Sequence, residues 1–180
     1  MKATNPTYHY KTMPSPVGEL TLVASDKGLA AILWENDPSN RVKLGEMEES
    51  KEHPMLLETE RQLKDYFAGK LKRFSVKLHF ATGTDFQKKV WQALTTIPFG
   101  ETRSYAQIAG QIGNPTAVRA VGAANGKNPI SIIAPCHRVI GSNGKLTGFA
   151  GGLEAKAYLL GIESKDDSQA GSGQGMLSLA

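Results

Sequence analysis

An apolar run from Asn128 to Ile140 places strong limits on the fold, because its many aliphatic side chains need a buried environment. Its first part, Asn128 to Ala134, is β-prone and predicts a largely buried, strand-like segment. Pro135 stiffens the backbone where that segment ends. Cys136, the only cysteine in the chain, is therefore expected at a rigid bend between buried segments, where it can line a pocket.

The residues around Cys136 suggest chemistry. A thiol has an ordinary pKa of about 8.5, yet the thiolate is the nucleophile, so a reactive cysteine needs a neighbour that favours the charged form. The imidazole of His137, next in sequence, is such a neighbour. The alternative is that Cys136 is only a small buried hydrophobic residue, which is the common fate of a single cysteine.

Composition limits the class of protein. With 180 residues, the chain can form one large or two small domains. One cysteine excludes an intramolecular disulfide, a CxxC redox pair and a thiolate-rich zinc site. The four histidines show no metal-ligand spacing, so we expect neither a metal nor a cofactor. The N-terminus has no apolar signal region and no stretch is long enough to span a membrane, so we expect a cytoplasmic protein without membrane contact.

Charge is distributed unevenly. The formal net charge is +4. Residues 1–80 carry 12 lysines and arginines against 11 acidic residues, whereas residues 81–164 carry 8 against 4. A polyanionic partner should therefore bind the second part of the chain.

The first 82 residues read as a small α/β unit. Alternating and apolar patterns between turn residues predict strands at 8–13, 19–24, 29–34 and 76–80. Apolar residues at helical spacing predict a helix over 54–67, with Pro54 in its first turn. The polar, acidic segment 36–53 predicts a solvated loop. Nothing in this unit suggests catalysis, so we interpret it as structural support.

From residue 83 the pattern becomes helical. Thr84 with Gln87 and Ser104 with Gln107 fit capping boxes, which begin one helix that reaches Ile97 and a second that ends near Gly113. Asn114 as N-cap and Pro115 at the first position predict a third helix directly afterwards. The last two helices form either a helix-turn-helix or a simple αα-corner.

The third helix carries small residues and a single charged one, Arg119. A helix with small side chains and one long cationic side chain can insert into a nucleic-acid groove. A surface salt bridge would also account for Arg119. Val118 and Val121 are its expected core contacts. Beyond it, Asn143-Gly144 predicts a hairpin turn. A last helix is expected over 153–162, with Leu153, Ala157, Tyr158 and Leu160 inward. Residues 164–180 are expected to be a disordered tail.

Taken together, Pro135-Cys136-His137-Arg138-Val139, the preceding stretch from Gly122 to Pro129 and the helix-turn-helix resemble the O6-alkylguanine-DNA alkyltransferases, also called methylated-DNA–protein-cysteine methyltransferases. The resemblance is strong over residues 84–163 and looser over residues 1–80. It implies an α+β fold with a small N-terminal α/β, ribonuclease-H-like lobe (1–82) and a C-terminal winged-helix or helix-turn-helix domain (83–163).

The resemblance also implies a function, namely DNA repair by direct reversal of damage. The protein would flip O6-alkylguanine out of double-stranded DNA and transfer the alkyl group irreversibly to its own cysteine, in one turnover and without a cofactor. O4-alkylthymine would be a poorer substrate. We expect a monomer, with cooperative binding along DNA left open.

The resemblance also implies roles for individual residues, each assigned by its position in the matching motifs. Cys136 would be the nucleophile and methyl acceptor, His137 would act as base through a water and keep the thiol ionised, and Glu163 would hold the imidazole. Residues alone leave Glu163 equally well explained as a solvated helix end. The other implied residues are Asn128 bracing the loop, Tyr105 donating to the base, Arg119 filling the gap in the stack from the minor groove, Asn114 and Ser142 on the DNA backbone, and Val139, Phe149 and Ala150 in the base pocket.

The chain departs from the family pattern at Phe149, where tyrosine is common, and at Ala134, where a larger aliphatic residue is common. Three other readings remain. An alkyltransferase-like protein that binds lesions without reacting would lack the nucleophile, whereas Cys136 is present. A winged-helix regulator would leave Cys136, His137 and Glu163 unexplained. A cysteine hydrolase would have no need of the slim Arg119 helix.

Overall fold

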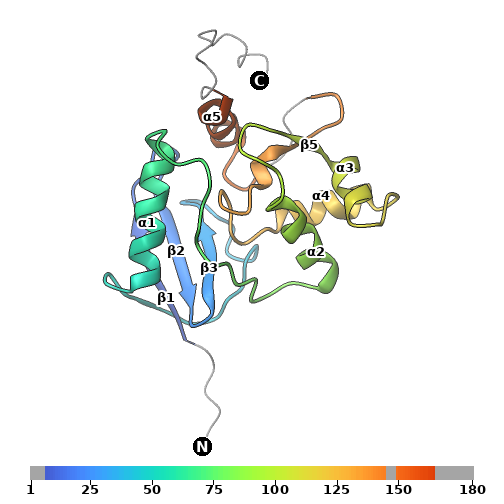
Figure 1. Cartoon of the computed structure of the whole chain (residues 1–180). Coiled ribbons are helices and arrows are strands. Elements are labelled where there is room, and N and C mark those ends of the chain that lie inside the picture. The colour runs from blue at the N-terminus through green and yellow to red at the C-terminus, as the bar shows by residue number, and fades with distance from the viewer. Residues whose placement is uncertain (1–6, 145–148, 165–180) are drawn as a thin grey trace, which may run out of the picture.

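The computed structural model of the chain describes residues 7–144 and 149–164. Two lobes lie side by side in Figure 1, with a sheet and α1 in one and helices α2 to α4 in the other. The expected tail falls, apart from Ser164, outside the described residues. Within the described ranges, no helix combines the length and apolar character needed to cross a membrane.

The N-terminal lobe is a four-stranded sheet in the order β3-β2-β1-β4, with α1 packed against it. The predicted meander is confirmed: β1 is antiparallel to β2, and β2 to β3, whereas β4 runs parallel to β1. The helix predicted over 54–67 is also confirmed. The elements are β1 (Tyr8–Met13), β2 (Leu20–Ser25), β3 (Gly28–Leu33), β4 (Met47–Glu49) and α1 (Pro54–Phe67).

Two expectations for this lobe are wrong. The fourth strand is β4, inside the segment expected to be a loop, whereas residues 76–80 make only an isolated bridge between Leu29 and Leu78. There the chain follows β3 closely, since Leu29 N–H donates to Lys77 O at 2.8 Å and His79 N–H donates to Leu29 O at 2.8 Å. Gly28, at φ 151°, permits this approach, because a Cβ there would lie 2.8 Å from Lys77 O.

In the C-terminal lobe, both predicted capping boxes are present. Helix α4 begins at Val118, later than expected, because residues 114–117 form a turn closed by Ala117 N–H and Asn114 O. Val121 is buried, but Val118 is 38% exposed, so the latter is not a core contact. The elements are α2 (Asp85–Leu94), β5 (Arg103–Ser104), α3 (Tyr105–Gln111), α4 (Val118–Gly126), the 3-10 helix η1 (Cys136–Arg138), β6 (Val139–Ile140) and α5 (Leu153–Ser164).

The predicted inward face of the last helix is mostly wrong. Leu160 is buried, but Leu153 and Tyr158 are exposed. The buried side chains of α5 include Lys156 and Glu163 instead. The predicted turn at Asn143-Gly144 is closed by Gly144 N–H and Gly141 O. However, β6 pairs in parallel with β5, and residues 145–148 lie outside the described ranges.

The segment 128–134 is buried as predicted, but it is not a strand. Ile130 makes one bridge to Ile32 of β3, and the rest of the segment turns. Ile130, Ile132, Ile133 and Ala134 join the apolar core of the N-terminal lobe. Cys136 and Val139, only a few residues later, belong to the core of α2, α3 and α4. The chain therefore crosses between the two lobes directly before the cysteine.

Candidate active site

Two tight turns present Cys136. Ile133 N–H donates to Ser131 O at 2.9 Å around Ile132, whose φ of 75° is a strained conformation for a β-branched residue. Cys136 N–H then donates to Ala134 O at 2.7 Å around Pro135. Backbone strain of this kind costs about 1–3 kcal/mol and persists only where the surroundings impose it. The predicted rigid bend is thus built from consecutive γ-turns.

Asn128 braces these turns from inside. Its side chain is fully buried, donates from Nδ2 to Ala134 O at 2.8 Å and accepts from Ile130 N–H at 3.0 Å. Asn128 therefore holds Ile130 and Ala134 together, and this is the kind of bracing contact that was expected of it.

Arg41 supports the same segment from the N-terminal lobe, and sequence reasoning missed it. Its guanidinium donates to Asn128 O at 2.9 Å and to Gly126 O at 3.1 Å, and it is paired with Asp37 at 2.7 Å. The segment 36–53 had been expected to be a solvated loop, yet the Arg41 side chain is 8% exposed. Only the spacing of Asp37 and Arg41 hints at this pair in the sequence.

Behind the cysteine, His137 and Glu163 form the expected contact. His137 Nε2 lies 2.7 Å from Glu163 Oε2, and both side chains are buried. Because the carboxylate accepts, Nε2 carries the proton and Nδ1 is left with its lone pair. Nδ1 is buried without a partner among the described residues, so it is available as an acceptor. The alternative of a solvated Glu163 at a helix end is wrong.

Glu163 accepts further hydrogen bonds, which the sequence did not predict. Arg138 donates to it from Nε at 2.8 Å and from Nη2 at 2.9 Å, and the Tyr66 hydroxyl of α1 donates at 2.6 Å. Burial alone would raise the pKa of Glu163, but His137 and Arg138 outweigh burial and lower it to about 2. The carboxylate is therefore ionised at any physiological pH.

The pKa values of the Cys136 thiol and the His137 imidazole shift in opposite directions. Burial raises the pKa of Cys136, against hydrogen bonds from Asn128 and Ser131 and the charges of Arg41 and Lys156. Burial lowers the pKa of His137, against the attraction of Glu163. Burial thus favours the neutral forms of both the thiol and the imidazole.

Lys156 on α5 is a buried cation close to this pair. Its ammonium donates to Val139 O at 2.7 Å. Burial lowers the pKa of Lys156 to about 8, with the attraction of Cys136 opposing it. The lysine thus remains mostly protonated at neutral pH and places positive charge near the sulfur.

The remaining predicted residues lie toward the surface of the C-terminal lobe. Tyr105 packs against the cluster that holds Cys136 and Val139, and a Cβ on Gly122 of α4 would lie 3.8 Å from its ring. Arg119 is exposed on α4. Asn114 and Ser142 are exposed in turns, and Phe149 and Ala150 are half-buried.

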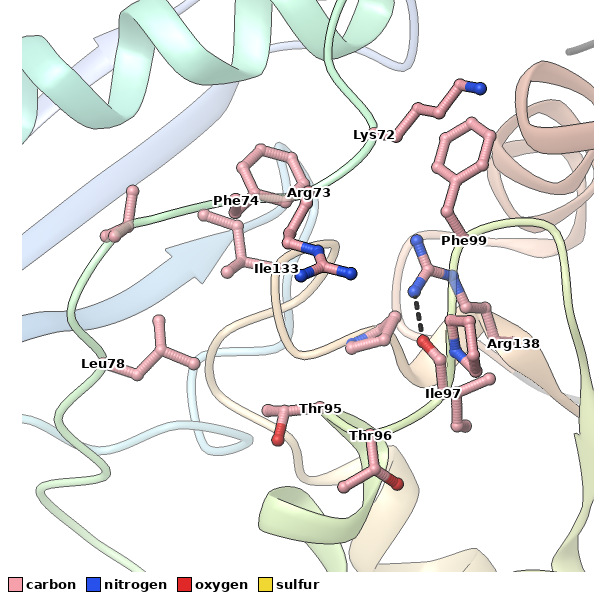
Figure 2. Close-up of a pocket in the computed structure, with 13 residues that line it drawn as sticks. Lys72, Arg73, Phe74, Leu78, Thr95, Thr96, Ile97, Phe99, Ile133 and Arg138 are labelled. Atoms are coloured by element: carbon pink, nitrogen blue, oxygen red, sulfur yellow. Dashed lines mark hydrogen bonds between the residues drawn. The ribbon is translucent and has the colours of Figure 1, made fainter.

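A cleft of about 610 Å³ lies between residues 72–78 and 95–99, and Ile133, Pro135 and Arg138 also line it. Figure 2 shows Arg138 and Phe99 on one side of it and Arg73 on the other, with the bond from Arg138 to Ile97 O dashed. None of its lining residues is acidic, and Cys136 is not among them. In the ranges that the structure describes, no cluster of histidine, cysteine and carboxylate side chains is suited to a metal ion.

Comparisons with known proteins match both lobes of the chain. Residues 8–80 match the ribonuclease-like domain of 6-O-methylguanine DNA methyltransferase, and residues 85–165 match its DNA binding domain. A methylated-DNA–protein-cysteine methyltransferase of Methanosarcina acetivorans is 50% identical over 157 residues, which are 86% of this chain and 97% of the relative. The constitutive one of Bacillus subtilis is 48% identical, over 86% of this chain and 94% of the relative.

A solved structure extends the likeness to three dimensions. The crystal structure of Mycobacterium tuberculosis OGT in complex with DNA has a TM-score of 0.79 and 45% identity, and it covers 95% of this chain and 99% of that one. Both lobes of the present structure, and the α+β fold class expected from the sequence, are thus accounted for. The chain belongs to the 6-O-methylguanine DNA methyltransferase family.

Proposed function

We propose that this protein repairs DNA by moving the alkyl group of O6-alkylguanine onto the sulfur of Cys136. The observation that carries the proposal is the buried arrangement of a single cysteine, an imidazole and a carboxylate. The imidazole Nδ1 has no partner among the described residues, and the ionised carboxylate orients the ring. Family membership and the DNA complex of the Mycobacterium tuberculosis relative support DNA as the partner.

The chemistry follows from the protonation states. As the sulfur approaches the alkyl carbon, the thiol proton passes through a water to His137 Nδ1, and Glu163 stabilises the imidazolium that forms. A carbon–sulfur bond forms while the carbon–oxygen bond breaks, and its electron pair stays with guanine, which regains one proton. Tyr105 assists by donating a hydrogen bond to the departing base. The thioether is stable, so one protein molecule repairs one lesion.

DNA contacts are assigned by position and exposure. Arg119, exposed on α4, would fill the space left by the flipped base, while Asn114 and Ser142 would bind the backbone. Val139, Phe149 and Ala150 would surround the base. The C-terminal lobe carries the excess positive charge, in agreement with a polyanionic partner. We assign residues 1–82 to support and 83–163 to DNA binding and transfer, in a monomeric, cytoplasmic protein that accepts O4-alkylthymine less well.

Mass spectrometry tests the proposal. Protein mixed with duplex DNA that carries one O6-methylguanine should gain one methyl mass, located on the peptide that contains Cys136, and the gain should stop at one equivalent. Cys136→Ser should bind the same duplex without any mass gain. Repeated turnover, or a methyl group on another residue, would refute the mechanism.

A further inference from the structure

Tyr66 reaches from the N-terminal lobe to the carboxylate that holds His137. It lies near the C-terminal end of α1 and is fully buried, and its hydroxyl lies 2.6 Å from Glu163 Oε2. The carboxylate is ionised and can only accept, so the phenol donates its single proton to that oxygen. A side chain from the lobe without the cysteine therefore contacts the group that orients the imidazole.

Aromatic neighbours fix the position of this hydroxyl. The Tyr66 ring lies edge-on to Phe67 and Phe99, with centroids 5.4 and 6.4 Å away. It is tilted against the Phe74 ring at 5.3 Å. A ring that is packed on several sides has little freedom to turn, because each contact restricts its rotamer. The hydroxyl is thus held beside Glu163 by the packing of its ring, and not by the carboxylate alone.

Tyr66 and His137 share one carboxylate oxygen. Glu163 Oε2 accepts from the phenol at 2.6 Å, from His137 Nε2 at 2.7 Å and from Arg138 Nη2 at 2.9 Å. Glu163 Oε1 accepts from Arg138 Nε at 2.8 Å, so the guanidinium holds the carboxylate with or without the phenol. Each hydrogen bond to an ionised oxygen stabilises the charge and makes the oxygen less basic. The phenol therefore weakens the attraction of Glu163 for a protonated His137.

We propose that Tyr66 is a positioning residue for the transfer reaction, whose hydroxyl limits the attraction of Glu163 for the imidazolium and so keeps His137 neutral until the thiol proton arrives. A neutral imidazole can take that proton, whereas a protonated one cannot. The proposal rests on the alkyl transfer proposed above and deepens it. It gives the N-terminal lobe a part in the chemistry, although the sequence suggested only structural support.

Other titratable groups lie close to this arrangement, namely Arg138, Lys156, Tyr158 and the neighbouring Cys136. Burial lowers the pKa of His137, with Glu163 opposing it and the two cations adding to it. Burial and Glu163 raise the pKa of Tyr66 well above its ordinary value, so the phenol keeps its proton. Removing the Tyr66 hydroxyl leaves all of these groups in the protein. A change in the titration of His137 would therefore come through the carboxylate.

Tyr66→Phe removes the hydroxyl and keeps the packed ring. In a Cys136→Ser background, which uncouples the imidazole from the thiol, NMR titration follows the ring signals of the four histidines, and the His137 signal is the one missing from His137→Gln. Its midpoint should rise by about half a pH unit, somewhat less than one ordinary hydrogen bond supplies, because Arg138 still withdraws charge from Glu163. An unchanged or lowered midpoint would overturn the proposal.

Two companion proteins separate the hydrogen bond from packing. Incorporation of 3-fluorotyrosine at position 66 keeps the hydroxyl and makes it a stronger donor, so the His137 midpoint should fall. A rise, as in Tyr66→Phe, would show that ring packing moves the imidazole, and the proposal would fail. Tyr158→Phe removes an exposed hydroxyl from the helix that carries Glu163 and should leave the midpoint unchanged. A shift as large as that of Tyr66→Phe would count against the proposal.

The thiol supplies a second readout. Because Cys136 is the only cysteine, the rate of its alkylation by iodoacetamide reports on that thiol alone. A more basic imidazole favours the pair of thiolate and imidazolium, so Tyr66→Phe should react about threefold faster at neutral pH, the factor that corresponds to half a pH unit. In a Glu163→Gln background the same substitution should have no effect, because the carboxylate that transmits it is gone. Equal acceleration in both backgrounds would contradict the proposed mechanism.

Neither readout requires DNA or methyl transfer, so a failure of the proposed function and a failure of the Tyr66 proposal are distinguishable. Where transfer occurs, its rate at saturating duplex DNA should fall off at low pH as His137 becomes protonated. In Tyr66→Phe this acid limb should move up by the same half pH unit. An NMR midpoint that shifts while the acid limb stays in place would show that Tyr66 tunes the imidazole but not the reaction, and it would overturn the assignment of Tyr66 as a positioning residue.

Discussion

Replacing Glu163 with glutamine removes one negative charge from the centre of the site and preserves its shape. The carboxylate accepts hydrogen bonds from His137, Arg138 and Tyr66, and it is 2% exposed. Glutamine resembles the protonated carboxyl group. The substitution therefore measures how much the folded protein depends on the ionised form.

The magnitude follows from the pKa of Glu163. Its ordinary value is 4.5 and its folded value is about 2. A difference of about 2.5 units corresponds to about 3 kcal/mol in favour of the ionised form. Removing one partner of a buried ion pair costs about 3–5 kcal/mol in other proteins, because the second charge is left unpaired. Both arguments predict that Glu163→Gln lowers the free energy of unfolding by about 3 kcal/mol at pH 7.

The pH dependence supplies the stronger test. A carboxyl group whose pKa is depressed by folding stabilises the protein fully above its unfolded pKa, and this stabilisation is lost as pH falls through the folded pKa. Urea unfolding of wild type and Glu163→Gln should thus differ most at pH 7 and converge as the pH falls from 4.5 toward 2. Glu154→Gln is the matched control, because Glu154 is exposed in the first turn of the same helix.

A stability difference between wild type and Glu163→Gln that stays constant from pH 7 to pH 3 would refute the reasoning. An equal loss in Glu154→Gln would show that the effect belongs to the charge of α5 and not to the buried site. In the same preparations, methyl transfer by Glu163→Gln should be slower at pH 7, since His137 loses the carboxylate that stabilises its protonated form.

Three further predictions concern the surroundings of the site. Arg41→Met should lower stability by about 3 kcal/mol in urea unfolding, because it leaves the Asp37 carboxylate without its cationic partner and two carbonyls without the guanidinium donor, and it should slow transfer. Arg119→Ala should leave the unfolding free energy unchanged within about 0.5 kcal/mol while slowing repair of duplex DNA more than reaction with a free-base analogue; equal slowing contradicts the wedge role. Gly151→Ala should cost about 1–3 kcal/mol, because the new Cβ meets the Trp34 ring, whereas Gly161→Ala, with open space on α5, should be neutral or stabilising by up to about 1 kcal/mol in thermal unfolding.

The sequence predicted what local rules determine. The capping boxes at Thr84 and Ser104 are local hydrogen-bond patterns, and both are present. The strands of the meander are bounded by turn residues and were found close to their predicted ranges. The contact between His137 and Glu163 was anticipated through family resemblance, since nothing in the intervening residues indicates that the two side chains meet.

Tertiary packing determined the features of the fold that the sequence did not predict. Residues 128–134 have the composition of a strand, but γ-turns in the segment prevent regular pairing with a neighbouring strand. Their apolar side chains are buried in the core of the N-terminal lobe all the same. Apolar and polar residues alternate over residues 76–80 as they do in a strand. The segment nevertheless pairs with the sheet only through a single bridge beside Gly28. The face of α5 was misassigned because the charged ends of Lys156 and Glu163 find partners inside, which a hydrophobic pattern does not reveal.

The passage of residues 130–134 through the core of the N-terminal lobe makes the two lobes inseparable in practice. A fragment cut at the boundary near residue 83 would keep the nucleophile but leave Ile130, Ile132 and Ile133 facing water. It would also lose Tyr66, Arg41 and Trp34, which come from the other side of the cut. The half of the molecule that carries the nucleophile therefore depends on the other half, and protein engineers who want a smaller alkyl acceptor should keep both.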